Sequence, residues 1–355
     1  MNYELSVITP CHNADIPMLE RAFKSLQAQT LGFEHIEWVV VVHNSSEESI
    51  KSIHAMTQAY PNVSVYMLRD TYKTVAAPRN HGLERATGTY IGFLDQDDWF
   101  ESDCYEKALR HIRETEADIV AFQIQSVSAD DGVQTVPPFT LLDQTKEVIV
   151  MERETWDSRL FMHIMGLGVW SKIYKREFLN KHLLQFDKGV HFCDDALFNI
   201  DCFDKAKRIA FLPQLVGYNY FLHSNSTVQN INKTPDEVVR YAEGFAETFE
   251  RGIGNGLYMP GVIWGYLCYM SAILLASAKL TMRERKAVYT LLSPYLKAEQ
   301  MDTEYAQKSY GNDGKIMRRF PNIVIGYPLI THSLVFLMKM LKVDIAGRLK
   351  KNQRY

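Results

Sequence analysis

The chain has 355 residues, 46% of them hydrophobic and 23% charged, which is enough for one large domain or for one domain with a smaller companion. Its formal net charge of −3 excludes a protein whose whole surface attracts nucleic acid. The five cysteines are odd in number and match no zinc or redox spacing, so we expect reduced thiols in a cytosolic protein. The first residues lack the pattern of a signal peptide, and none is expected.

Strands and helices alternate through the first third of the chain. Residues 37–42 form a continuous apolar run, which is typical of a strand buried on both faces. Further strands are expected at residues 5–8, 63–67, 89–94 and 118–125. This alternation predicts an α/β fold with a mostly parallel sheet, right-handed crossovers and flanking helices.

The helices between these strands carry start signals. Asp15 can cap a helix whose first turn contains Pro17. Ser45, with Glu48 three residues later, has the spacing of a capping box and predicts the start of the next helix. A third helix is expected over residues 79–85.

The rest of the chain changes character. Strand patterns return at residues 209–211 and 216–221, and helical patterns follow from Pro235 onward. We therefore predict two domains, a ligand-binding and catalytic one over residues 1–230 and a helical region over residues 231–355.

Two apolar segments of the helical region could contact a membrane. Residues 257–278 contain no charged side chain, and both a buried core helix and a membrane-embedded segment remain open. Residues 323–343 suit a helix in a membrane interface or an ordinary amphipathic helix that covers the core. Residues 315–355 hold nine Lys or Arg and one Asp, a local charge of +8 against −11 for the remainder. This asymmetry predicts a docking surface for something anionic.

Polar residues follow the predicted strands, at the edge where parallel sheets bind ligands. They lie in the segments Thr9 to Asn13, His43 to Ser46, Arg79 to Gly82 and Asp95 to Asp98. The first of these loops has no glycine, although dinucleotide folds and Walker-type loops need glycine where phosphate approaches the backbone. The missing glycine argues strongly against a dinucleotide-dependent enzyme and excludes a Walker-type phosphate loop.

Three carboxylates, those of Asp95, Asp97 and Asp98, follow one apolar strand. So many like charges at the mouth of a buried strand are costly unless a cation neutralises them. Oxygen ligands favour a hard divalent ion such as Mn²⁺ or Mg²⁺. A cation at this edge, near glycine and arginine, indicates a bound diphosphate.

Three segments together resemble the N-terminal half of the family 2 glycosyltransferases. They are SVITPCHN at residues 6–13, APRNHG at residues 77–82 and FLDQDDW at residues 93–99. In addition, FCDDALF at residues 192–198 is similar to the acidic pair that precedes an apolar helix in that family. The resemblance implies a GT-A fold, a nucleotide-sugar donor and a divalent cation.

The resemblance also implies roles for individual residues. Asp195 is the expected catalytic base, which takes the proton of the attacking hydroxyl. Trp170 and Asp194 are expected on the acceptor side, and Asp97, Asp98 and His223 as ligands of Mn²⁺ or Mg²⁺. The expected donor-binding residues are Thr9, Pro10, Asn13, Asn44, Arg79, Asp95 and Asp97.

Each of these roles has a purely structural alternative. Asp194 and Asp195 could be a helix cap and a first-turn acid that the helix dipole favours. Trp170 could belong to the core, and His223 could be a surface histidine. Asp95 could cap a turn, Asp97 and Asp98 could be solvated, and Arg79 could lie on the surface.

The chain departs from the family at one donor-side loop. His43-Asn44-Ser45 stands where the family usually has an acidic pair and a glycine, one of whose carboxylates normally contacts the nucleobase. His43 or Asn44 could still form hydrogen bonds with a uracil edge.

The resemblance therefore implies an inverting glycosyltransferase that uses a UDP-linked donor and a glycan or lipid-linked acceptor, in surface polysaccharide or cell-wall glycan synthesis. We expect it in the cytoplasm, peripheral on the inner face of the membrane, with no nucleic-acid partner. The alternative is a GT-A-like nucleotide- or glycan-binding module without activity. Sugar nucleotidyl transfer would need a glycine- and arginine-rich first loop, which is absent.

Overall fold

The computed structural model describes residues 3–72, 74–128, 132–134, 145–155, 168–190, 193–223, 234–254 and 280–294. The chain divides into two compact units. The first contains Met1–Trp156, His163–Gly189 and Asp194–Leu222, and the second contains Asp157–Met162, Val190–Cys193 and His223–Tyr355. The boundary expected at residue 230 falls outside the described residues and stays a prediction.

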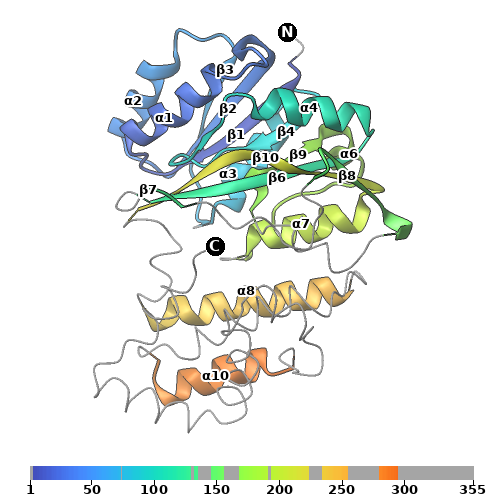
Figure 1. The fold of residues 1–355 in the computed structure, drawn as a ribbon. Helices are drawn as coiled ribbons and strands as arrows, with labels where there is room; N and C mark the ends of the chain where they lie inside the picture. The colour runs from blue at the N-terminus through green and yellow to red at the C-terminus, as the bar shows by residue number, and fades with distance from the viewer. Residues whose placement is uncertain are drawn as a thin grey trace. The chain divides into compact units, whose positions relative to one another are not determined.

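The first unit is built on one mixed sheet with the strand order β3-β2-β1-β4-β9-β6-β10-β5 (Figure 1). Its first half is parallel, as predicted, and consists of β1 (Leu5–Cys11), β2 (Ile36–His43), β3 (Val63–Leu68) and β4 (Tyr90–Phe93). Every residue of β1 and β2 is buried, which explains the apolar run Trp38–Val42 of β2.

The second half of the sheet mixes directions. Strand β9 (Lys172–Lys175) is antiparallel to both of its neighbours, β4 and β6 (Ile119–Ser128). Strand β10 (Arg208–Leu222) is parallel to β6 and antiparallel to β5 (Trp99–Phe100) and β8 (Ile149–Glu152). Strand β7 (Gly132–Gln134) pairs with β6.

One strand replaces the two that were expected between residues 209 and 221. The register of β10 against β6 shifts between Leu212 and Val216, and Pro213 lies in that interval. Proline cannot donate to the ladder, so it interrupts the strand pattern in the sequence while the backbone continues through a bulge. The side-chain amide of Gln123 donates to the carbonyl of Pro213.

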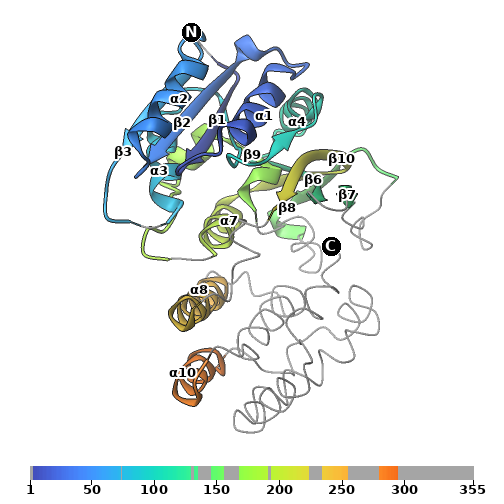
Figure 2. The same ribbon diagram turned by 90° about the vertical axis from the view of Figure 1, so that its left-hand side faces the viewer.

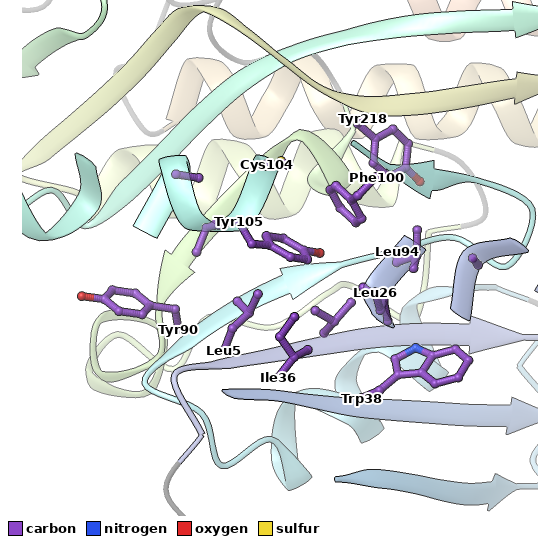
Figure 3. Close-up of a cluster of buried hydrophobic side chains, with 14 of the residues drawn as sticks. Leu5, Leu26, Ile36, Trp38, Tyr90, Leu94, Phe100, Cys104, Tyr105 and Tyr218 are labelled. Carbon is purple, nitrogen blue, oxygen red and sulfur yellow. The ribbon is translucent and has the colours of Figure 1, made fainter. Parts of the chain in front are cut away.

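Helices cover both faces of this sheet (Figures 1 and 2). Helices α1 (Ile16–Gln27), α2 (Glu47–Thr57) and α4 (Cys104–Glu114) contribute to one buried cluster with Leu5, Trp38 and Tyr218 (Figure 3). Helix α3 (Ala76–Arg85) packs on the other face, where Gly82 lies so close to Ile8 that a Cβ would be 2.4 Å from its side chain. The described part of this unit also contains η1 (Phe33–His35), η2 (Arg153–Thr155), η3 (Val169–Ser171), α6 (Arg176–Lys181) and α7 (Asp194–Lys205).

The helix caps were predicted correctly in one case and wrongly in the other. The Asp15 side chain accepts a hydrogen bond from the Met18 amide, as expected for the N-cap of α1. Helix α2 is capped by Ser46, which accepts from the Ser49 amide, and not by Ser45. The Ser45 hydroxyl instead accepts from the amide of Asn13 and donates to the carbonyl of His43. The tertiary contact to the first loop therefore decides which serine is the cap.

The second unit contains α8 (Pro235–Gly254) and α10 (Met282–Leu292) in its described part. Thr281 and Glu284 form a reciprocal capping box at the start of α10. Within the described residues, no helix combines the length and apolar character needed to cross a bilayer. Residues 257–278 and 315–355 lie outside them, so both expectations about membrane contact remain predictions.

Candidate active site

A buried arginine lies at the centre of the predicted site. Arg79 is in the first turn of α3, and only 3% of its surface is exposed. Its Nη2 donates to Asp95 Oδ1 at 3.1 Å and its Nη1 to Asp194 Oδ2 at 3.0 Å. Nη1 also donates to Asp195 Oδ1. One guanidinium therefore joins the loop after β4 to the start of α7. Asp95 in that loop and Asp194 in α7 are separated by about 100 positions in the sequence.

The charges in this cluster do not balance, because three carboxylates face one guanidinium. Burial opposes the charge on Arg79, but the neighbouring carboxylates raise the pKa of its guanidinium above the ordinary value. Burial raises the pKa of the Asp195 carboxyl to about 7, and the nearby Asp194 and Asp95 add to this although Arg79 opposes it. Burial likewise raises the pKa of Asp95. Asp195 keeps 19% of its side chain exposed, so it is accessible from solvent.

Asp98 is the most buried of the three strand-end carboxylates, with 1% of its surface exposed. It accepts a hydrogen bond from the Tyr218 hydroxyl at 2.6 Å and one from the Phe221 amide at 2.7 Å. Burial, and then the charges of Asp97 and Asp95, raise the pKa of the Asp98 carboxyl well above its ordinary value. Asp98 thus anchors the loop to β10, and its role as a metal ligand stays a prediction.

Asp97 lies in the same loop and is partly exposed. Its backbone carbonyl accepts from Arg21 Nη2 at 2.7 Å. The Arg21 guanidinium lies 4.0 Å from the centre of the Trp99 ring and 4.2 Å from that of Phe221. These contacts hold the backbone at Asp97, whose side chain is partly exposed like that of Asp95.

The donor set fits a divalent cation only in part. Within the described segments, no group of three His, Cys, Asp or Glu side chains could hold a metal ion by itself. Mg²⁺ is commonly held by one or two carboxylates together with substrate phosphates, and Asp97 can supply such a carboxylate. His223 belongs to the second unit, and its role as a ligand stays a prediction.

Three of the predicted donor-side residues lie at or just after the carboxyl end of β1. Thr9 is fully buried, and its hydroxyl accepts from Trp38 Nε1 at 2.8 Å. Pro10 is also buried, whereas Asn13 is exposed and accepts from the Ser46 amide at 3.0 Å. These contacts brace the loop edge, and direct contact with a donor stays a prediction for all three residues.

The carboxylate of Asp70, in the segment after β3, lies beside the His43-Asn44-Ser45 loop, where the chain departs from the family. Asp70 Oδ1 lies 2.9 Å from His43 Nε2, which is a hydrogen bond or ion pair that depends on the protonation of the ring. Asn44 Nδ2 donates to the Asp70 carbonyl at 3.2 Å, and Asn44 Oδ1 accepts from the Asp70 amide at 3.2 Å. The predicted Asn44 side chain is therefore engaged by the backbone, and Asp70 is a site residue that the sequence analysis missed. It lies two residues after the end of β3, so the rule that ligands bind at the carboxyl ends of parallel strands could have found it.

On the predicted acceptor side, Trp170 is partly buried and stacks on two tyrosines. Its ring centre lies 4.8 Å from that of Tyr218 and 5.7 Å from that of Tyr220. The same Tyr218 holds Asp98, so Trp170 borders the carboxylate loop. Both expected roles, a surface for a sugar ring and a part of the core, are compatible with this position.

Comparison with known proteins agrees with this arrangement. The model of the family described as "Glycosyl transferase family 2" matches residues 6–183. The chain belongs to this family. The match covers the parallel half of the sheet, the carboxylate loop and β9, while Asp194 and Asp195 follow it in the sequence.

The family 2 relatives include proteins of bacterial cell-surface polymers. The chain is 28% identical over 228 residues to the uncharacterized glycosyltransferase EpsJ of Bacillus subtilis, and the aligned region covers 63% of this chain and 63% of EpsJ. It is 38% identical over 125 residues to the minor teichoic acid biosynthesis protein GgaB of the same species, and this aligned region covers 35% of this chain and 14% of GgaB. The similarity thus spans less than two thirds of the length of these relatives.

Solved structures of low identity establish that this family 2 chain has the GT-A fold. Staphylococcus aureus TarS 1–349 in complex with UDP-GlcNAc superposes with a TM-score of 0.65 at 18% identity and covers 96% of this chain and 92% of TarS 1–349. The mannosyltransferase PcManGT of Pyrobaculum calidifontis, in complex with GDP-Man and Mn²⁺, gives a TM-score of 0.52 at 14% identity and covers 97% and 89% of the two chains. The predicted fold class is confirmed.

Proposed function

We propose that this chain is an inverting, metal-dependent glycosyltransferase that moves a sugar from a UDP-linked donor to a glycan or lipid-linked acceptor. The observation that carries the proposal is the junction at Arg79, which places Asp195 of α7 beside Asp95 of the carboxylate loop. Such a junction sets a candidate base next to a candidate donor site within one network.

The reaction follows from these positions. The acceptor hydroxyl attacks the anomeric carbon of the sugar and passes its proton to Asp195, while a new carbon–oxygen bond forms. The bond between that carbon and the diphosphate breaks, and the nucleoside diphosphate leaves with the electron pair. A single displacement inverts the anomeric configuration.

A divalent ion held by Asp97 would stabilise the charge on the departing diphosphate. Asp195 suits the base role because burial raises the pKa of its carboxyl to about 7, close to a physiological working pH. Asp95 contributes a carboxylate toward the donor, held in place by Arg79. In this account Arg79 acts through the carboxylates, whereas the sequence analysis expected it to contact the donor directly.

The donor base and the acceptor class rest on the relatives. TarS has been solved with UDP-GlcNAc, and one relative is named a poly(ribitol-phosphate) beta-glucosyltransferase. TarS is likewise named a poly(ribitol-phosphate) beta-N-acetylglucosaminyltransferase. We take a UDP-linked hexose as the donor and a surface glycan or its lipid-linked precursor as the acceptor, at the inner face of the cell membrane.

The donor is tested by thermal shift with UDP-GlcNAc, UDP-glucose and GDP-mannose, each with and without Mn²⁺. A ligand at 100 times its Kd adds about 2.7 kcal/mol of stability, so a true donor should raise Tm measurably. We expect the increase for a UDP-sugar, and a larger one with Mn²⁺. No increase with any of the three sugars would contradict the proposal.

A second candidate is a nucleotide- or glycan-binding module without activity. The observation that favours it is the loop at His43 and Asn44, whose polar groups are engaged by Asp70. Calorimetry separates the two functions, because a module would bind UDP without metal dependence and without donor turnover.

A further inference from the structure

A single peptide group connects the candidate base to a buried lysine. The carbonyl of Gly168 accepts a hydrogen bond from Lys172 Nζ at 2.8 Å. The amide of Val169, which belongs to the same peptide bond, donates to Asp195 Oδ2 at 3.2 Å. Lysine, peptide and carboxylate therefore form a continuous chain of donors and acceptors.

Such a chain has an electrostatic consequence. A cation at the carbonyl oxygen draws electrons through the conjugated peptide bond and makes its N–H a stronger donor. Hydrogen bonds to the charged form of a carboxylate favour that form. Lys172 thus supports the unprotonated state of Asp195, which is the state that accepts a proton.

Lys172 is costly to keep in this position. It lies on β9 with 1% of its surface exposed, and burial lowers the pKa of its ammonium to about 7. A methionine or leucine would fill the same space without that desolvation cost. Its Nζ also donates to Ser171 Oγ at 3.3 Å. A lysine kept in this position despite the cost of burial points to a role beyond packing.

The peptide itself is held in place by the neighbouring indole. A Cβ at Gly168 would lie 2.1 Å from an atom of the Trp170 ring. Glycine is thus needed for the close approach of the ring to the backbone. Trp170 on one side, Lys172 at the carbonyl and Asp195 at the amide fix the orientation of this peptide.

We propose that Lys172 is a positioning residue that acts through the Gly168–Val169 peptide to orient Asp195 and to keep it ready to accept a proton. The proposal rests on the proposed function of Asp195 as the base. It adds a residue that lies behind the site and whose charge sets the working pH of the base.

The other charged and titratable groups around the pair are fixed by the structure. Those that face Asp195 or Lys172 are Arg79 on α3, Asp95 after β4, Tyr174 on β9, and Asp194 and Cys202 on α7. Replacing Lys172 leaves each of these side chains in the protein, so a change in the titration of Asp195 reports the loss of Lys172.

The test compares Lys172→Met and Lys172→Gln with the wild type and with a control, Lys175→Met. Lys175 lies on the same strand, but its ammonium donates to the carbonyl of Glu116. The readouts are the pH profile of kcat, the donor KM, and the titration of the Asp195 carboxyl carbon by NMR. The NMR signal is assigned by its absence in Asp195→Asn, and it requires no donor.

Both Lys172 variants should move the acid limb of the kcat profile, and the NMR titration, to higher pH by about half a unit or more. The donor KM should change less than about twofold, because only 1% of the surface of Lys172 is exposed to a ligand. Lys175→Met should leave all three readouts unchanged. If Lys172→Met does not fold, Lys172→Gln gives the result, because it keeps a donor without the charge.

An unchanged titration of Asp195 in a folded Lys172 variant would overturn the inference, whatever happens to the rate. Absence of turnover in the wild type, together with a shifted NMR titration in the variants, would instead refute the proposed function and leave the coupling of Lys172 to Asp195 intact.

Discussion

At the scale of single residues, the candidate site contains more carboxylates than cationic groups. Arg79 is shared among three carboxylates, and its Nε has no hydrogen-bond partner among the described residues. Removing one partner of a buried ionic cluster leaves charges without compensation, which costs more than the cluster contributes. Arg79 is therefore expected to matter for stability as well as for the position of Asp195.

Arg79→Met should lower the free energy of unfolding by about 3 kcal/mol at pH 7.5, because three partly buried carboxylates lose the guanidinium with which all of them form ion pairs. Arg85→Met on the same helix is the control, since a third of that side chain is exposed. Urea denaturation measures both. Equal losses for the two variants would contradict this account of the cluster.

The raised pKa of Asp195 makes stability depend on pH with a defined sign. Between about pH 4 and pH 7 the folded protein holds a proton at Asp195 that the unfolded chain has released, so this group lowers stability as the pH rises through that window. Asp195→Asn removes the effect. The variant should therefore gain stability relative to the wild type between pH 4.5 and 7.5, on the order of 2 kcal/mol by urea denaturation. Parallel pH curves for the two proteins would show that the pKa is not raised.

At the scale of elements, two asparagines tie the ends of the parallel strands together. Asn13 and Asn44 both have left-handed backbones, with φ of 43° and 47°. Asn13 binds the start of α2, and Asn44 binds the segment after β3. These bonds connect three loops that the sheet alone would leave independent.

A substitution series at Asn44 separates backbone strain from hydrogen bonding. Asn44→Gly keeps the left-handed backbone and loses the side-chain bonds, while Asn44→Ala loses both. We expect Asn44→Gly to cost about 1 kcal/mol and Asn44→Ala about 1 kcal/mol more in thermal or urea denaturation. Equal costs would mean that the φ of Asn44 carries no strain.

The elements also show what the sequence could and could not predict. β1, α1, β2, α3 and β4 were expected, because each depends on local periodicity and caps. The short β5 and β9 were not, because four residues such as Lys172–Lys175 become a strand only through pairing with β4 and β6, which are distant in the sequence.

The candidate site was predicted to a similar extent. Asp95, Asp194, Asp195 and Arg79 were chosen for their motifs, and the structure brings them together. Lys172 and Asp70 were missed. Lys172 contacts Asp195 through a backbone peptide, which no side-chain pattern reveals, and Asp70 lies outside the segments that carry the family resemblance.

At the scale of the whole molecule, the last 41 residues differ in net charge from the rest of the chain. Residues 315–355 carry +8 and the remainder carries −11. An anionic bilayer attracts basic residues near its surface by about 1 kcal/mol each. The basic end would keep the enzyme close to a lipid-linked acceptor.

Replacing Arg348, Lys350 and Lys351 by Gln should therefore weaken flotation with vesicles that contain phosphatidylglycerol, and should leave binding to neutral vesicles unchanged. A matched triple variant on the first unit, at Lys51, Lys107 and Lys205, is the control. Equal flotation of the two triple variants would exclude a membrane role for this end of the chain.

The central claim is that Asp195 is the base of a nucleotide-sugar transfer at the Arg79 junction. The most direct test measures UDP release and donor affinity for the wild type and Asp195→Asn, with Mn²⁺ and the UDP-sugar that binds best. The account predicts UDP release by the wild type, loss of at least about 100-fold of that rate in Asp195→Asn, and donor Kd values within about twofold of each other. An Asp195→Asn protein that releases UDP at the wild-type rate, or that no longer binds the donor, would contradict it.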